Sequence, residues 1–120
     1  MNAKLISMSW SKPSEDLLEM LEELLDEVPF ERRKMFGQYA LFYRGHMFAG
    51  VFQDDIFLRL HPEKQDSLKK DNDEVEQFQP LKGRSMKEYV IIPESIYSDT
   101  ATMRDLLTSS ITFVKSLQPK

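Results

Sequence analysis

Six basic side chains in two short segments are the residues whose chemistry is most able to recognise a ligand. They are Arg32, Arg33, Lys34, Lys82, Arg84 and Lys87. If the two segments meet in space, the six cations could bind a phosphate backbone or an acidic partner. The alternative is ordinary charge beside strands, which protects sheet edges and keeps a domain soluble. Because short basic runs are weak motifs, we favour the second interpretation and keep the six residues as a candidate interaction surface.

Residues that could support catalysis or hold a metal ion form no recognised pattern. The chain has no cysteine and two histidines, His46 and His61, whose spacing matches no metal-binding motif. No serine stands in a nucleophile elbow, and the glycines form no phosphate-binding loop. We therefore predict that the protein is not an enzyme, that it needs no cofactor or metal, and that both histidines lie on the surface.

The charge of the chain weighs against a nucleic-acid ligand. The formal net charge is −4, and a field of that sign repels phosphate backbones. Seven carboxylates and no base fall in one segment that is predicted to be helical. They are Glu15, Asp16, Glu19, Glu22, Glu23, Asp26 and Glu27. This face could dock a basic partner, but a solvated face opposite the core is the more common case, and we expect the latter.

Length and composition indicate one domain in the cytoplasm. A chain of 120 residues is the size of a single domain, and we predict one domain over residues 1–120 with an ordered core at about 13–117. No apolar run approaches the roughly 20 residues of a membrane span. The N-terminus lacks the apolar core of a signal peptide, and absence of cysteine suits a reducing compartment.

The hydrophobic periodicity predicts an α+β fold. The elements expected in chain order are a helix over 13–28, strands over 38–43, 46–52 and 56–60, a short helix over 62–70, a loop over 71–79, a strand over 85–92 and a helix over 100–117. Their order is α-β-β-β-α-β-α. We expect an antiparallel sheet of four or more strands, with the N-terminal and C-terminal helices packed on it.

Three local signals refine this layout. The apolar stripe expected to join the first helix to the last consists of Leu17, Leu21, Leu24 and Val28, and it is widened by Leu18 and Leu25. A two-residue turn is expected at Arg44-Gly45, and an N-cap of the last helix at Asp99.

The strand over 46–52 is apolar on both faces, whereas a one-sided antiparallel sheet alternates apolar and polar residues. Something must therefore cover its second face. We predict that a homodimer or a partner surface does so.

The segment from Arg33 to Ala49 carries a family resemblance. It reads RKMFGQYALFYRGHMFA and resembles the block R-K-M-F-G-G-Y-G-L-F-Y-x-G-x-M-F-A of the TfoX N-terminal domain family. Segments 57–60 and 83–93 extend the similarity over nearly the whole chain. The motif residues to which the resemblance assigns a structural role are Met35, Phe36, Gly37, Tyr39, Phe42, Gly45, Met47 and Phe48.

The resemblance implies a function related to bacterial competence. It suggests a non-catalytic regulatory module that binds an unidentified protein partner, like the N-terminal domain of competence transcriptional regulators. The alternative is a direct nucleic-acid-binding protein of the YjbR-like type, which would use a local basic patch. We favour the first, because Gln38 and Ala40 are the departures from the TfoX block and the rest of that block is kept.

Overall fold

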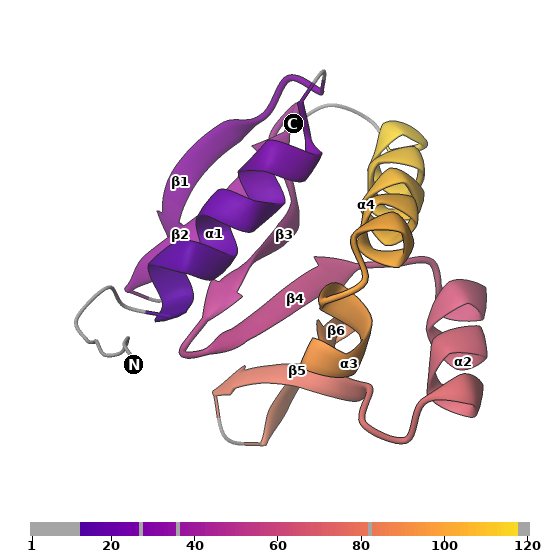
Figure 1. Ribbon diagram of the computed structural model, residues 1–120. Coiled ribbons are helices and arrows are strands. Elements are labelled where there is room, and N and C mark those ends of the chain that lie inside the picture. The colour runs from indigo at the N-terminus through magenta and orange to yellow at the C-terminus, as the bar shows by residue number, and fades with distance from the viewer. Residues whose placement is uncertain (1–12, 27, 36, 82, 118–120) are drawn as a thin grey trace.

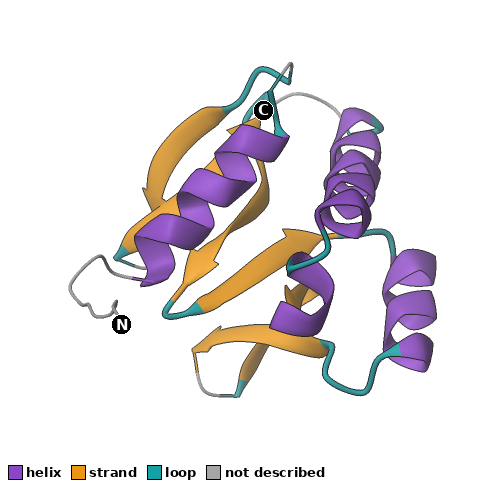
Figure 2. Cartoon of the chain, viewed as in Figure 1, coloured by secondary structure: helices purple, strands orange, loops and turns teal. Residues whose placement is uncertain are grey.

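The computed structural model describes residues 13–26, 28–35, 37–81 and 83–117. Its helices and strands, in chain order, are α1 (Pro13–Leu24), β1 (Glu31–Met35), β2 (Gln38–Tyr43), β3 (His46–Phe52), β4 (Asp55–Arg59), α2 (Pro62–Asp71), β5 (Glu76–Leu81), β6 (Arg84–Ile92), α3 (Glu94–Tyr97) and α4 (Thr100–Lys115). Figure 1 labels these elements, and Figure 2 separates helices from strands by colour.

All six strands join one antiparallel sheet in the order β1-β2-β3-β4-β6-β5. The first four strands follow one another as a meander. The chain then passes through α2 and returns so that β6, not β5, pairs with β4. The predicted α+β class, with helices before and after an antiparallel sheet, is confirmed.

Three elements of the structure are absent from the sequence-based layout. β1 occupies the basic segment that was expected to precede the sheet, and β5 begins inside the segment predicted to be a loop. β1 could not be predicted from periodicity, because its first four residues are all charged and show no alternation between an apolar and a polar face. Pro80 weakens the strand signal of β5. The short helix α3 was also missed.

Local signals at turns and caps are confirmed. Arg44 and Gly45 have φ values of 51° and 86°, which is the left-handed pair that a two-residue hairpin turn requires. The Asp99 carboxylate accepts a hydrogen bond from the Thr102 N–H at 3.2 Å and caps α4. Both features fix where the neighbouring elements begin.

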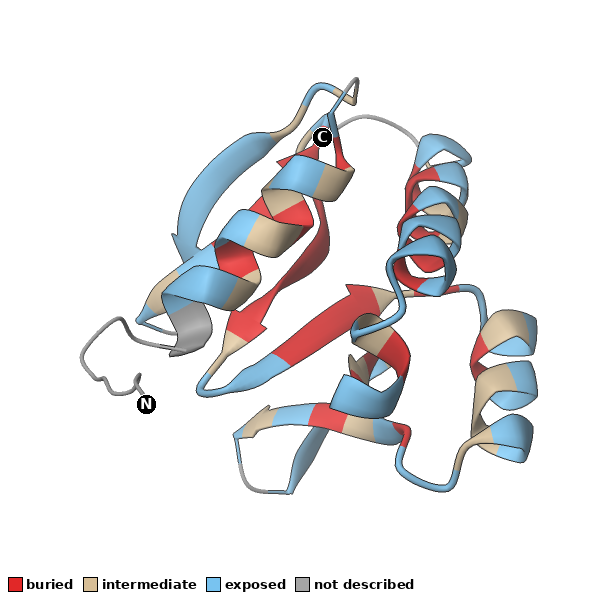
Figure 3. Cartoon of the chain, viewed as in Figure 1, coloured by how far each residue is buried: buried red, intermediate tan, exposed pale blue. Residues whose placement is uncertain are grey.

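The main core lies between the sheet and the helices α1 and α4. Leu18, Leu21 and Leu25 point into it from the first helix and its C-terminal turn, and Met103 and Leu107 join them from α4. Figure 3 shows the buried residues of these helices on the sides that face the sheet. The predicted stripe is confirmed at Leu21 and at the two residues that widen it, Leu18 and Leu25, whereas its other three residues pack against this core only partly buried. They are Leu17, Leu24 and Val28.

Ser110 ties α4 to the sheet through a buried polar contact. Its hydroxyl oxygen lies 2.9 Å from the Phe48 carbonyl oxygen on β3 and 2.7 Å from the Arg59 carbonyl oxygen on β4. The single hydroxyl proton is shared between these two carbonyl oxygens. Because Ser110 is completely buried between α4 and the sheet, a larger side chain would not fit at this position.

The opposite face of the sheet has a core of its own. This second-face cluster consists of Ala40, Phe42, Met47, Phe57, Phe78 and Tyr89. The ring of Phe57 on β4 stacks on that of Phe78 on β5, with centroids 4.3 Å apart, although β6 lies between these strands. The sheet must therefore curl, and the register of the β5–β6 pair is irregular on both sides of Phe78.

This curl removes the reason for predicting a dimer. All six residues of the second-face cluster are buried within a single chain, with exposures of 8% or less. The Tyr89 hydroxyl, also buried, donates to the Met47 carbonyl oxygen at 3.0 Å. The apolar second face of β3 is thus explained by the fold of one chain, and the sequence argument for a covering partner no longer holds.

We predict that Leu21→Ala lowers the free energy of unfolding by roughly 2–5 kcal/mol, because the leucine is completely buried and the cavity would stay empty. Leu17→Ala, at a half-buried site on the same helix, should cost less. Urea denaturation of both variants measures the difference. A midpoint unchanged by Leu21→Ala would show that α1 packs through another face.

Candidate interaction surface

β1 places three of the predicted cations along one edge of the sheet. Arg32, Arg33 and Lys34 are all exposed, and only Met35 at the end of the strand is partly buried. Side chains alternate along a strand, so Arg32 and Lys34 lie on the face that α1 covers, and Arg33 lies on the other. Figure 1 shows β1 as the outermost strand on the upper left.

Arg32 is held between the first helix and an aromatic ring. Its Nε and Nη2 atoms donate to the two carboxylate oxygens of Glu22 on α1, at 2.9 and 2.7 Å. The guanidinium carbon lies 5.2 Å from the centroid of the Tyr39 ring, within the range of a cation–π contact. The hydrogen bond with Glu22 raises the pKa of Arg32, so the side chain keeps its charge.

Arg33 repeats this arrangement on the opposite face. Its guanidinium lies 4.6 Å from the centroid of Phe42 in the second-face cluster, and it donates to the Glu31 carboxylate at 2.6 and 2.9 Å. Exposed ion pairs of this kind add little to stability. Their effect is to hold two planar guanidinium groups in fixed orientations on the surface.

The remaining predicted cations lie elsewhere. Arg84 and Lys87 belong to β6, and three strands separate β6 from β1. Four strand spacings amount to about 19 Å along the sheet. Lys82 lies outside the described residues. The five described cations therefore belong to two separate clusters, three on the open edge formed by β1 and two on β6.

The described family-motif residues lie on β1, β2, β3 and the turns that join these strands. Phe42, Met47 and Phe48 are buried. Gly37 and Gly45 have positive φ values, as tight turns require, and Phe36 lies outside the described residues. Tyr39 differs from the others because 42% of its surface is exposed.

Sequence reasoning could have found this edge from one signal. Only Phe36 and Gly37 separate Met35 from Gln38, and a two-residue connection with glycine between two runs is typical of a β-hairpin. That signal predicts a strand before Gln38. The register of that hairpin then determines which residues of β2 lie beside Arg32 and Arg33, and so places the two guanidinium groups over aromatic rings.

The two histidines have different surroundings. His46 is buried at the start of β3, so the prediction that it lies on the surface is wrong. His61 is exposed, and its Nδ1 atom accepts the Glu63 N–H at 3.2 Å, which caps α2. Within the described part of the chain, no group of three or more His, Cys, Asp or Glu side chains is placed to hold a metal ion.

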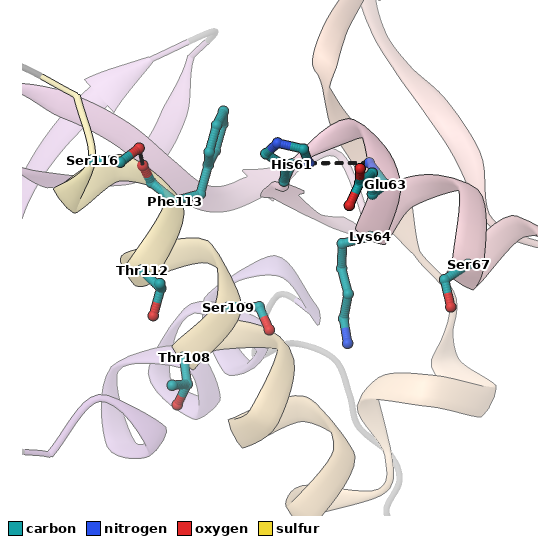
Figure 4. Close-up of a pocket in the computed structure, with 9 residues that line it drawn as sticks. All are labelled: His61, Glu63, Lys64, Ser67, Thr108, Ser109, Thr112, Phe113 and Ser116. Carbon is teal, nitrogen blue, oxygen red and sulfur yellow. Dashed lines mark hydrogen bonds between the residues drawn. The ribbon is translucent and has the colours of Figure 1, made fainter.

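A groove of about 630 Å³ separates the N-terminal end of α2 from α4 (Figure 4). Its lining residues are His61, Glu63, Lys64, Ser67, Thr108, Ser109, Thr112, Phe113 and Ser116. The Thr108 hydroxyl donates to the Arg104 carbonyl oxygen at 3.0 Å, and the Ser116 hydroxyl also donates to its own helix. The His61 ring meets Phe113 edge-on. These contacts engage His61, Thr108 and Ser116 in the local structure of α2 and α4.

A second hollow of about 530 Å³ is strongly acidic. Asp54, Asp55, Glu74, Glu76 and Glu94 line it. Burial raises the pKa of the Asp55 carboxyl, and the nearby charges of Asp54 and Glu76 raise it further. The hollow therefore concentrates like charges that repel one another at neutral pH.

Comparison with known proteins gives the family. The sequence profile of the TfoX N-terminal domain matches residues 19–114, which is well over half of the chain. The chain belongs to the TfoX N-terminal domain family. Comparison with curated proteins finds no match. The matched segment of this TfoX domain includes the second half of α1, the whole sheet and nearly all of α4.

No helix among the described residues is long and apolar enough to cross a membrane.

We predict that Asp55→Asn raises the stability of this TfoX domain at neutral pH by up to about 0.5 kcal/mol, the range for a surface site. A raised pKa means that the folded chain binds this proton more tightly than the unfolded chain does. Stability from Asp55 is then present below its unfolded pKa and is lost as the pH rises through the folded pKa.

Urea denaturation at pH 7 and again near pH 4 tests the sign. The advantage of Asp55→Asn should shrink at the lower pH, where a larger fraction of the parent carboxyl is protonated. An advantage of equal size at both pH values, or a less stable variant, would contradict the assignment.

Proposed function

We propose that this domain is a non-catalytic regulatory module related to competence regulators, and that it acts by binding a protein partner. Family membership supports the regulatory part of the proposal. We favour a protein over a small substrate as the partner for two reasons. The acidic hollow is lined by carboxylates that repel one another, and two hydroxyls of the groove between α2 and α4 are engaged with their own helix. We place this activity in the cytoplasm, since a chain without cysteine suits a reducing compartment.

The observation that carries the proposal is the ordered pair of arginines on β1. Arginine and tyrosine are enriched at protein interfaces and among the residues that contribute most to binding. Arg32, Arg33 and Tyr39 expose 44%, 48% and 42% of their surfaces, the arginine values being those of the side chains. Because the guanidinium groups are already oriented, less side-chain freedom is lost when a partner binds.

The same surface is a poor match for duplex DNA. Each of the two arginines shares its charge with a carboxylate of its own chain. The net charge of the chain is −4, and three strands separate the second basic cluster from β1 in the sheet. A phosphate backbone needs several uncompensated cations along one path.

Fluorescence anisotropy with labelled duplex DNA tests this choice. We expect no saturable binding at physiological ionic strength. Size-exclusion chromatography with a partner protein purified after capture from bacterial extract should instead give a stoichiometric complex. Arg33→Glu should weaken that complex without unfolding the domain.

Direct DNA binding would be recognised by the salt dependence of the affinity. If the six basic residues contact phosphates, the affinity should fall with salt with a log–log slope of about −5. Tight DNA binding with such a slope, abolished by Arg33→Glu, would overturn the proposed function in favour of a nucleic-acid-binding protein.

A further inference from the structure

β1 is an edge strand whose outer side has no pairing partner among the described residues. It pairs with β2 alone, over Glu31–Met35. No backbone hydrogen bond outside that ladder involves these five residues in the described part of the chain. Such an edge presents a row of N–H and C=O groups to which another extended chain can add.

The hairpin geometry shows which groups point outward. Two residues connect Met35 to its partner Gln38, and a hairpin of that length closes on a pair that exchanges both hydrogen bonds. Because bonded and non-bonded pairs alternate in an antiparallel ladder, Arg33 and its partner Ala40 form the next bonded pair. The N–H and C=O groups of Arg32 and Lys34 therefore face away from the sheet.

The side chains beside this open ladder are basic. Arg32 and Lys34 lie on one face and Arg33 on the other, all of them exposed. A strand that adds to the edge places its side chains directly beside these residues, and opposite charges stabilise such cross-strand neighbours. The edge thus favours a strand that carries carboxylates.

An apolar hollow lies at the N-terminal end of the same edge. Its volume is about 250 Å³, and its lining residues are Pro29, Phe30, Glu31, Phe42, Tyr43 and Arg44. Four of these six are apolar or aromatic, so the hollow suits one apolar side chain of an incoming segment.

Charge disfavours a second copy of the chain in the register that pairs β1 with β1 over its full length. Antiparallel pairing of two β1 strands centred on Arg33 would set Arg33 against Arg33 of the other copy, and Arg32 against Lys34. Like charges directly opposite each other are destabilising. Charge therefore selects a different chain, one that is acidic where β1 is basic.

We infer that β1 binds an extended acidic segment of a partner protein by strand addition, with one apolar residue of that segment in the hollow beside Phe30 and Phe42. This inference rests on the proposed function and names the surface and the partner's chemistry. The backbone ladder supplies the contact area. Lys34 supplies most of the preference for carboxylates, because Arg32 and Arg33 already share their charges with Glu22 and Glu31.

A synthetic peptide of alternating glutamate and valine, with leucine at one end, is the probe. It should bind at least about tenfold more tightly than the same peptide with lysine in place of glutamate. It should also slow amide hydrogen exchange at Arg32 and Lys34, the two outward N–H groups. The two peptides share length and alternation, so they differ only in charge.

Two variants separate the ladder from the charges. Lys34→Pro removes an outward N–H and leaves the β1–β2 ladder intact, and it should weaken binding about tenfold or more. Lys34→Glu keeps the N–H and should weaken binding of the acidic peptide by about threefold through charge alone. Lys70→Glu, at an exposed site in the last turn of α2, is the matched control and should bind as the parent does. Urea midpoints verify that each variant is folded.

Other outcomes are equally defined. Equal binding of the two peptides, protection mapped to a surface other than β1, or full binding by both Lys34 variants would overturn the inference. Self-association through β1 would do so as well. If the peptide fails in these ways and the domain also does not bind DNA, the edge-strand inference falls while the proposed function stands.

Discussion

The stack of Phe57 on Phe78 is the contact on which the rest of this fold depends. The two rings come from strands that are not neighbours, and they can meet at 4.3 Å only because the sheet curls. Gly50 makes room for this contact. A Cβ atom at that position would lie 2.5 Å from Cζ of Phe57 and 3.0 Å from Cβ of Ala40, closer than side-chain atoms pack. The absence of one methyl group thus allows the second-face cluster to close.

Closing that face determines where the domain can interact. Helices cover one side of the sheet, and the curled strands bury the other, so the extended apolar surfaces are used within the chain. The parts of the sheet that remain for binding another chain are its two edge strands. β5 ends one side of the sheet with a proline and an irregular register, both of which discourage pairing. β1 ends the other side with a regular ladder and oriented arginines, and the proposed function therefore depends on this edge.

Sequence predicts the elements whose signals are local. β2 and β3 have the predicted bounds, because the Arg44-Gly45 turn and the apolar runs beside it are short-range features. Non-local features could not be predicted. The Gln77 side-chain amide lies 2.8 Å from the Lys87 carbonyl oxygen and 2.9 Å from that of Tyr89, and it supports the irregular β5–β6 pair. Gln65 contributes from α2 by donating to the Leu60 carbonyl oxygen. No spacing in the chain reveals these partners.

The candidate site also combines local features, which the sequence predicts, with non-local ones, which it does not. The basic residues of β1 are visible in the sequence, but their aromatic supports are not, because Tyr39 and Phe42 meet them only through the hairpin register. The apolar residues on both sides of β3 correctly predict that both faces of this strand are covered. The sequence could not indicate that the cover comes from Phe78 and Tyr89, which lie on strands formed later in the chain.

Urea denaturation of Gly50→Ala tests the central claim most directly, because the sign of the effect decides it. The φ angle of Gly50 is not positive, so alanine fits the backbone and would stabilise the chain by about 0.4–1 kcal/mol if space were available. We predict a loss of roughly 1–3 kcal/mol instead, from overpacking against Phe57. In a Phe57→Leu background, the same substitution should cost clearly less. A Gly50→Ala variant that is as stable as the parent, or more stable, would contradict the account.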